Sequence, residues 1–313
     1  MRYLIAGGAG FIGSHLTERF VRNGAEVTVI DNLVTGNKNN LRNVLSRIEF
    51  FESDIADFDT DMKYDAVFHL AAIANTYDYI KNRYDVLKSS SFGTDRLLKI
   101  AEKSAAEFYY FSSSEVYGHI CTDKDTTICE KDLFSVATMN ERSPYFVGKM
   151  FSEEYVKAFC EKKCLKHMII RPFNVYGTRM DSRSEYGRVM TNFFRLASSA
   201  QPLVINGDGE QTRSFCHVDD FVDAVISLIK ARPWKYNVVN IGNPETININ
   251  TLAGKISSFF GEETRIEKAS PVMFEPRYRR PNIDRIYKMT GWKPKINIDD
   301  GLSDVFLKEH SNR

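Results

Sequence analysis

The sequence predicts an α/β fold in which a doubly wound parallel sheet is followed by a smaller α/β domain. Short apolar runs alternate with longer amphipathic helical runs, which is the pattern of a parallel sheet covered by helices on both faces. A glycine-rich turn joins the first apolar run to the first helical run. After Arg171-Pro172 the elements become shorter and loops take a larger share. We therefore expect one domain over residues 1–171 and a second, partly interleaved with it, over 172–313.

The first domain contains the strands and helices that the pattern predicts most clearly. Apolar runs place strands at residues 2–6, 26–30, 48–51, 65–70, 107–112 and 166–170. Amphipathic runs place helices near 12–23, 85–103 and 144–163. These helices are long enough to cross over between parallel strands in the right-handed sense. Beyond them, the turn Asn206-Gly207-Asp208-Gly209 and the proline-bearing stretch 271–281 are typical of a smaller domain with more loop.

The turn after the first strand reads Gly7-Gly8-Ala9-Gly10-Phe11-Ile12-Gly13. Two glycine spacings coincide in it, Gly-x-Gly-x-x-Gly and Gly-x-x-Gly-x-x-Gly. Glycine lets the backbone approach a pyrophosphate, and the helix that follows offers free N–H groups and the positive end of its dipole. The sequence therefore predicts a Rossmann-type dinucleotide site that includes Gly7, Gly10, Phe11, Ile12 and Gly13.

The second predicted strand leads into Asp31. A carboxylate at this offset accepts hydrogen bonds from the adenosine ribose and repels the additional phosphate of NADP. We therefore expect NAD as the cofactor. Asn32, Lys38 or Arg42 could weaken this preference if Asp31 turned away from the ribose.

Tyr145 and Lys149 lie four residues apart and share one face of a predicted helix. Ser143 is suited to cap this helix and Pro144 to its first position, so Tyr145 falls in the first turn. The ammonium of Lys149, a cationic nicotinamide and the helix N-terminus would each favour a phenolate and lower the pKa of Tyr145 from about 10. Tyr145 is therefore a candidate base near neutral pH.

A third group of polar residues follows the strand predicted at 107–112. It reads Phe111-Ser112-Ser113-Ser114-Glu115-Val116-Tyr117-Gly118. Ligands bind at the carboxyl ends of strands in open parallel sheets. This position makes the serines and Glu115 candidates for the same site as Tyr145.

With these motifs the chain resembles the extended short-chain dehydrogenase family of nucleotide-sugar epimerases, dehydratases and decarboxylases. The resemblance extends over nearly the whole chain. Further motifs that carry it are His69-Leu70-Ala71-Ala72, Arg171-Pro172-Phe173-Asn174-Val175-Tyr176-Gly177, Gly207-Asp208-Gly209, Arg213-x-x-x-His217-Val218-Asp219-Asp220, Asn240-Ile241-Gly242 and Arg279-Arg280-Pro281.

The resemblance implies that carbon 4 of a nucleoside-diphosphate sugar is oxidised by hydride transfer to NAD. Tyr145 would remove the hydroxyl proton, Ser113 would share a hydrogen bond to that oxygen, and Lys149 would hold the ribose. Further implied cofactor contacts are Asn32, Asp54, Ile55, Leu70, Ala71 and Ala72. Implied substrate contacts are Ser114, Asn174, Arg213 and Arg279, of which Asn174 and Arg213 match positions that hold the diphosphate.

The fate of the 4-keto sugar depends on residues that the family varies. Glu115 is common in dehydratases, where it removes the carbon 5 proton, and in UDP-glucuronate decarboxylases. Many NAD dehydratases have aspartate where this chain has Ser114, which counts against dehydration. The pattern Ser113-Ser114-Glu115 with Arg279 is most similar to decarboxylases, and it also occurs in GDP-mannose dehydratases, whose usual preference for NADP conflicts with Asp31.

We therefore favour decarboxylase or 4,6-dehydratase chemistry. Three alternatives stay open: a 4-epimerase, a plain carbon 4 dehydrogenase that releases the 4-keto sugar, and a non-catalytic NAD-binding sensor. Relatives usually have asparagine where this chain has Ser90, so the network near the nicotinamide is expected to differ. The long charged segment 120–142 is expected to cover the sugar. The sequence does not disclose the base or the sugar.

The composition agrees with a cytoplasmic enzyme. The net charge of +1 offers no broad field for nucleic acid or an anionic membrane. No apolar run approaches the roughly 20 residues of a membrane span, and the first strand takes the place of a signal peptide. Members of the family that this chain resembles usually dimerise through two long helices. The resemblance therefore implies that the helices 85–103 and 144–163 pair across a two-fold axis, giving a homodimer or a dimer of dimers.

The cysteines are odd in number and scattered, which favours reduced thiols over a disulfide framework. They are Cys121, Cys129, Cys160, Cys164 and Cys216. Cys160 and Cys164 are expected to share a helix face at the spacing i, i+4. No second pair of Cys or His lies close to them in sequence, so no metal is expected.

Overall fold

A computed structural model of the chain describes residues 1–118, 123, 125–132, 143–180, 189–261, 264–270 and 277–309. The chain divides into two compact units. The first unit comprises residues 1–116, 139–171 and 232–239, and the second comprises 117–138, 172–231 and 240–313. Each unit is therefore assembled from segments that are distant in the sequence.

The first unit is built on a seven-stranded sheet with the order β11-β6-β5-β4-β1-β2-β3. The strands are β1 (Arg2–Ala6), β2 (Glu26–Asp31), β3 (Glu49–Glu52), β4 (Ala66–His69), β5 (Glu107–Phe111), β6 (His167–Pro172) and β11 (Val238–Ile241). In the part of the sheet that runs β6-β5-β4-β1-β2-β3, each strand pairs in parallel with its neighbours. The predicted α/β fold with a doubly wound parallel sheet is confirmed.

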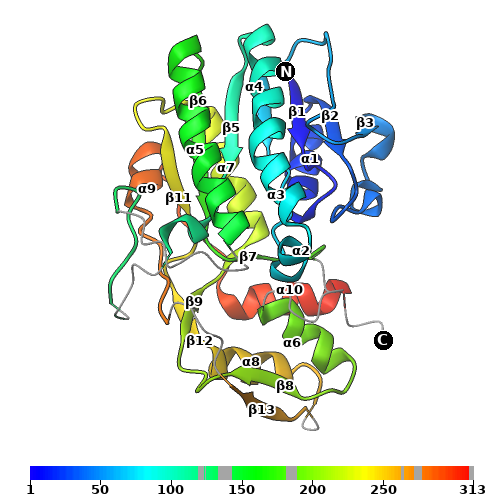
Figure 1. Cartoon of the computed structure of the whole chain (residues 1–313). Helices are drawn as coiled ribbons and strands as arrows, with labels where there is room; N and C mark the ends of the chain where they lie inside the picture. The colour runs from blue at the N-terminus through cyan, green and yellow to red at the C-terminus, as the bar shows by residue number, and fades with distance from the viewer. Residues whose placement is uncertain are drawn as a thin grey trace. The chain divides into compact units, whose positions relative to one another are not determined.

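The helices of the first unit are α1 (Phe11–Arg22), α2 (Thr76–Lys81), α3 (Arg83–Lys88), α4 (Thr94–Ser104) and α5 (Ser143–Lys163). Its described part also contains the 3₁₀ turns η1 (Lys38–Leu41), η2 (Leu45–Arg47) and η4 (Ser114–Tyr117), the last of which ends at the unit boundary. Helices α4 and α5 lie side by side over the sheet (Figure 1). Their inner faces and the strands supply buried apolar side chains to one core, among them Leu4, Val67, Leu97, Phe108 and Val156.

The helix predicted at 85–103 is not a single regular α-helix. A π-helical turn, η3 (Ser89–Gly93), joins α3 to α4. The hydroxyl of Ser152 on α5 donates to the carbonyl of Ser90 at 2.6 Å. The neighbouring helix thus provides a hydrogen bond within the irregular turn, which helical periodicity alone does not reveal.

Within its described residues, the second unit contains three pairs of short strands. They are β7 (Val175–Tyr176) with β10 (Cys216–His217), β9 (Thr212–Ser214) with β12 (Thr246–Asn248), and β8 (Leu203–Asn206) with β13 (Ile266–Ala269). Its helices are α6 (Val189–Ser198), α7 (Val218–Ala231), α8 (Ile249–Ser257), α9 (Asp284–Thr290) and α10 (Ile298–Glu309). Helices α6, α8 and α10 contribute to a separate apolar core, which includes Phe193, Leu252 and Leu302.

The sequence did not predict strand β11. It lies at the edge of the large sheet beside β6, although about 65 residues separate the two strands. Apolar periodicity identifies a strand but not a partner so far away in sequence. Among the helices that the structure describes, none is both long and apolar enough to cross a membrane.

Candidate active site

The glycine turn packs backbone against backbone. Gly7 has φ of +82°, in the left-handed region. A Cβ at Gly7 would lie 2.6 Å from the backbone nitrogen of Ala71, and a Cβ at Gly13 would lie 2.1 Å from the carbonyl oxygen of Gly7. Side chains are therefore excluded at both positions by contacts within the protein itself, a reason that differs from the expected approach to a pyrophosphate.

Helix α1 presents its N-terminus at this turn. Gly10 is the N-cap residue and has no side chain that could cap the helix. The first-turn N–H groups, those of Phe11, Ile12 and Gly13, have no carbonyl partner within the helix. A 12-residue helix that begins behind an open glycine turn provides both donors and a positive dipole end. These features fit the pyrophosphate of a dinucleotide.

Asp31 lies directly against the same turn. Its carboxylate oxygens accept hydrogen bonds from the backbone N–H groups of Ala9 and Leu33, both at 2.9 Å. Burial raises the pKa of Asp31, and these hydrogen bonds oppose that rise. Asp31 therefore lies at the end of β2 and against the glycine turn, with Asn32 next to it in the chain. Lys38 lies over the ring of Phe50, 4.7 Å from its centroid.

The remaining expected cofactor residues follow the carboxyl ends of neighbouring strands. Asp54 and Ile55 come shortly after β3, and Leu70, Ala71 and Ala72 come directly after β4. The parallel register brings these ends to one edge of the sheet. Lys88 donates to Asp54 at 2.9 Å, and Ile55 is buried against Gly93.

Ser113 and Glu115 follow the carboxyl end of β5. The hydroxyl oxygen of Ser113 accepts the backbone N–H of Glu115 at 3.1 Å, at the start of η4. Because this contact uses a lone pair, the hydroxyl proton of Ser113 is still available for donation. Ser114 is buried, whereas Glu115 is partly exposed.

Lys149 links α5 to the end of β5. Its ammonium donates to the carbonyl of Phe111 at 2.6 Å and lies 4.9 Å from the ring centroid of Tyr110. Helix α5 begins at Ser143, so Tyr145 lies in its first turn, as predicted. Because Phe111 directly precedes the serine run, this contact brings the Tyr145–Lys149 helix to the strand end that carries Ser113.

Burial and a neighbouring carboxylate act on Lys149 in opposite directions. The residue is 4% exposed, and burial lowers its pKa to about 7, while the charge of Glu153 favours the ammonium. Glu153 lies one helical turn further along α5. Its two oxygens bind the guanidinium of Arg171 at 2.9 and 2.5 Å, and both side chains are at most 5% exposed.

This buried ion pair was not predicted from the sequence. The spacing of Glu153 from Lys149, four residues on one helix face, was the available signal for Glu153. Nothing in the sequence showed that Arg171 at the end of β6 would be its partner, since the pairing depends on how α5 packs on the sheet.

The expected substrate residues of the second unit lie close to one another. Asn174 donates its side-chain amide to the carbonyl of Ser214 at 2.9 Å. Ser214 is adjacent to Arg213 in β9, and the guanidinium of Arg213 donates to the carbonyls of Thr212 and Arg277. Arg279 follows two residues later, and both guanidinium groups are buried. Asn174 and Arg213 thus lie at neighbouring positions, and the guanidinium of Arg279 donates to the carbonyl of Gly118 at 3.4 Å.

Two further expectations concern other parts of the chain. Helix α5 ends at Lys163, and Cys164 lies beyond it with φ of +54°. Cys160 is buried and Cys164 is exposed, so the expected shared helix face is wrong. Among the described residues there is no cluster of three metal-binding side chains. Cys121 and most of the segment 120–142, expected to cover a sugar, lie outside the described residues.

Comparison with known proteins adds independent findings. A model of the NAD dependent epimerase/dehydratase family matches residues 3–242. The chain is 33% identical over 305 residues to UDP-glucuronic acid decarboxylase 1 of Danio rerio, covering 96% of this chain and 71% of that protein.

Two solved structures are also similar to this chain. One is UDP-glucose 4-epimerase of Thermotoga maritima with UDP-glucose, with a TM-score of 0.87, 28% identity and 97% of each chain covered. The other is UDP-glucuronic acid 4-epimerase of Bacillus cereus with UDP-glucuronic acid and NAD, with a TM-score of 0.84, 26% identity and 98% of each chain covered. Both proteins are named 4-epimerases, and their names give different UDP-sugars.

Proposed function

Because the chain belongs to the NAD-dependent epimerase/dehydratase family, we propose that it oxidises carbon 4 of UDP-glucuronate and releases the carboxyl group as carbon dioxide. The observation that carries this proposal is the contact of Lys149 with the carbonyl of Phe111, which brings the helix of Tyr145 to the strand end of Ser113 and Glu115. The decarboxylase relative supplies the substrate class.

The first unit supplies the cofactor site of this proposal. The N–H groups behind Gly10 hold the pyrophosphate and Asp31 accepts from the adenosine ribose. NAD, when bound, supplies the hydride acceptor. Lys149 binds the ribose on the nicotinamide side of NAD and keeps positive charge beside Tyr145. Asp54, Ile55 and the residues after β4 complete the contacts at the same sheet edge.

Tyr145 acts as the base for the carbon 4 hydroxyl. Ser113 donates its hydroxyl proton to the same substrate oxygen, so the developing charge is shared between two donors after the proton has moved. In the second unit, Asn174 and Arg213 bind the diphosphate, and Arg279 adds a third donor group for the substrate. Ser114 contributes a hydroxyl contact to the sugar.

Decarboxylation requires fewer catalytic groups from the protein than dehydration does. A 4-keto glucuronate is a β-keto acid, so the electrons of the bond between carbons 5 and 6 move to the keto oxygen as carbon dioxide leaves. Protonated Tyr145 then stabilises the enolate oxygen, and carbon 5 takes up a solvent proton delivered through Glu115. Return of the hydride to carbon 4, with the proton of Tyr145, would restore the hydroxyl and leave no net NADH. Dehydration requires an acid for the departing hydroxyl. Ser114, where many NAD dehydratases have aspartate, is a poor acid, which supports decarboxylation.

A 4-epimerase is the second candidate. It is favoured by the two similar solved structures, both of which are named 4-epimerases. In this case the 4-keto sugar would be reduced again from the opposite face, and Glu115 would have no proton to transfer at carbon 5.

The deciding experiment incubates purified protein and NAD with UDP-glucuronate and with UDP-, GDP-, CDP- and dTDP-hexoses, followed by mass spectrometry. We expect loss of carbon dioxide from UDP-glucuronate without net formation of NADH. An unchanged mass with a new retention time would establish an epimerase. Loss of water would establish a dehydratase, and stoichiometric NADH with loss of two hydrogens would establish a dehydrogenase. No reaction across the panel would contradict the proposed activity and favour a sensor.

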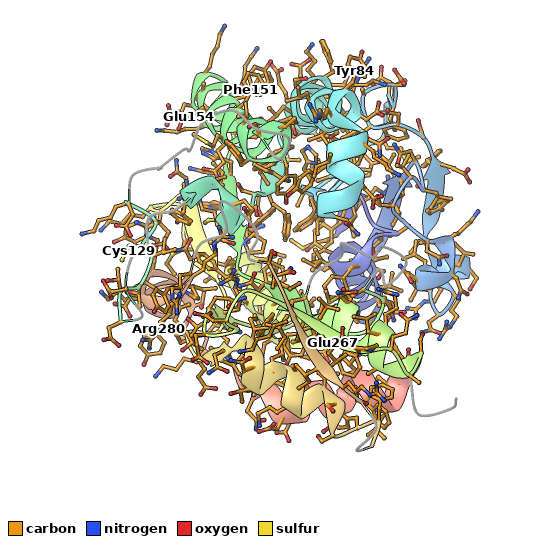
Figure 2. The ribbon with its side chains drawn as sticks, turned by 60° about the horizontal axis from the view of Figure 1, so that its bottom comes forward. Tyr84, Cys129, Phe151, Glu154, Glu267 and Arg280 are labelled. Atoms are coloured by element: carbon orange, nitrogen blue, oxygen red, sulfur yellow. The ribbon has the colours of Figure 1, made fainter. Side chains whose placement is uncertain are left out.

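We also propose a homodimer that pairs α3–α5 of two chains. Large apolar side chains are exposed on these helices and the turn between them: Tyr84 is 72%, Phe92 65% and Phe151 48% exposed. Figure 2 shows Tyr84 and Phe151 on two neighbouring helices of the first unit. Light scattering should give twice the mass of one chain, and Phe151→Glu should shift the equilibrium toward the monomer. A monomeric native protein at micromolar concentration would contradict this.

A further inference from the structure

A second tyrosine ring lies flat against Tyr145. The ring centroids of Tyr79 and Tyr145 are 5.1 Å apart, and the ring planes differ by 9°. Tyr79 is 4% exposed and Tyr145 is 9% exposed. Tyr79 belongs to α2 and was not among the residues expected at the site. The stacked pair is therefore a contact between the proposed base and a residue with no assigned role.

The stacked pair is part of a small apolar cluster. Its other buried members are Ile73 and Val86, with Ala74 and Ile80 partly buried beside them. This cluster is separate from the larger core beneath the sheet helices. It surrounds the ring of Tyr145, while the polar residues near Lys149 lie one turn further along the helix.

Stacking restricts the torsion that aims the phenol. Helix α5 fixes the Cα and Cβ of Tyr145, but the χ2 torsion of a tyrosine has a broad range. Rotation about χ2 would drive the ring edge into the face of Tyr79. The flat contact therefore holds the plane of the ring, and with it the direction of the lone pairs on the phenol oxygen.

Helix α2 is itself held in place. The N–H of Tyr79 donates to the carbonyl of Asn75 at 3.0 Å, and the side chain of Asn82 donates to the carbonyl of Asp78 at 2.8 Å. Helix α2 also packs on both α3 and α5. It follows the segment after β4 that contains the expected cofactor contacts at 70–72. Tyr79 is thus a buried side chain on a helix that its neighbours hold in place.

We propose that Tyr79 is a positioning residue that holds the ring of Tyr145 in the orientation needed for proton transfer. This inference rests on the proposed role of Tyr145 as the base. Tyr79 does not touch substrate in this proposal; it acts through the geometry of its neighbour. Loss of the stacked ring also leaves space into which the ring of Tyr145 can shift. Because a misplacement of about 1 Å can reduce turnover about 100-fold, kcat should fall while binding is retained.

The test compares Tyr79→Leu, Tyr79→Phe and Val86→Ala at a temperature where all are folded. Leucine removes the flat face, so kcat should fall about 10- to 100-fold while KM for the sugar and NAD affinity change little. Phenylalanine keeps the stacked face and should restore most of kcat. Val86→Ala makes a cavity in the same cluster without removing the ring, so it should lower thermal stability and keep kcat.

A second readout does not depend on turnover. Carbon-13 tyrosine labelling with Tyr145→Phe assigns the ring signal of Tyr145. In Tyr79→Leu this signal should lose the ring-current shift that the stacked neighbour causes, whereas Tyr79→Phe should retain it. An unchanged signal in Tyr79→Leu would show that the rings do not stack and would overturn the inference.

The two readouts also separate this inference from the proposed function. If the native protein turns over sugar and Tyr79→Leu has the native kcat, positioning by Tyr79 is wrong and the function stands. If Val86→Ala loses as much kcat as Tyr79→Leu, the effect comes from general packing and the inference is overturned. If the native protein acts on no nucleotide sugar, the proposed function fails and positioning for catalysis falls with it, although NMR still tests the stack.

Discussion

The glycine turn after β1 and the inner face of α5 serve the same proposed reaction but are built in opposite ways. At the turn, close backbone contacts leave no room for a side chain at Gly7 or Gly13. On α5, function depends on side chains whose partners come from other elements: Phe111 for Lys149, Arg171 for Glu153 and Tyr79 for Tyr145. A turn that requires glycine can be predicted from the sequence. The contacts of a helix face with residues far away in the chain cannot.

The largest effect should come from the reacting group on α5. Tyr145→Phe removes the proposed base, so turnover should fall about 1000-fold, or about 4 kcal/mol in the activation barrier, while NAD binding is retained. Tyr155→Phe is the matched control on the same helix. The hydroxyl of Tyr155 donates to Asp95 at 2.8 Å and has no proposed part in the reaction. Equal turnover by Tyr145→Phe and the native enzyme would refute the assignment.

The buried ion pair should show the next largest effect, this time on stability. Glu153→Gln removes the carboxylate charge that binds the guanidinium of Arg171 in a buried site, so the free energy of unfolding should fall by about 3 kcal/mol. Glu26→Gln is the control, since Glu26 pairs with Arg2 at an exposed site and should show no measurable change. Urea unfolding measures both, and equal midpoints would mean that the buried pair adds nothing.

The packing of the glycine turn can be tested by replacing Gly13, with Gly254 of another helix as the control. Gly13→Ala places a Cβ against the carbonyl of Gly7, so the free energy of unfolding should fall by about 2 kcal/mol and NAD affinity should drop. Gly254→Ala in α8 meets nothing within 4 Å and should instead stabilise the protein by about 0.5–1 kcal/mol. Denaturant unfolding and NAD titration report the two effects. Normal NAD binding by Gly13→Ala would show that the turn is more adaptable than its packing indicates.

The last test concerns the pH dependence of stability, which is measured as a slope. Burial lowers the pKa of Lys149 to about 7 from 10.5. Between these values the unfolded chain binds a proton that the folded chain does not, so the unfolding free energy contributed by Lys149 rises with pH, by at most about 1.4 kcal/mol per unit.

The measurement is urea unfolding at several pH values between 7 and 10. Lys149→Met should remove this contribution to the slope, while Lys157→Met, at an exposed position on the same helix, should keep the native slope. Parallel plots of stability against pH for Lys149→Met and the native protein would show that burial does not lower the pKa of Lys149.

Much of the first unit could be predicted because its signals are local. The six predicted strands occur within two residues of their expected bounds, and Tyr145 lies in the first turn of its helix. The π-helical turn at Ser89–Gly93 and the departure of Cys164 from the helix face were not predicted. Both depend on how a chain end or a neighbouring helix packs, and apolar periodicity does not record this.

The sequence by itself determined the parallel sheet, the glycine turn with Asp31, and the pairing of Tyr145 with Lys149 on one helix face. Each of these follows from backbone geometry or from a spacing of a few residues, so nearby residues suffice to specify it. Only the tertiary structure decided that β11 joins the sheet, that Arg171 neutralises Glu153 and that Tyr79 stacks on Tyr145. These contacts join elements far apart in the chain, and burial makes them strong only after those elements have packed together.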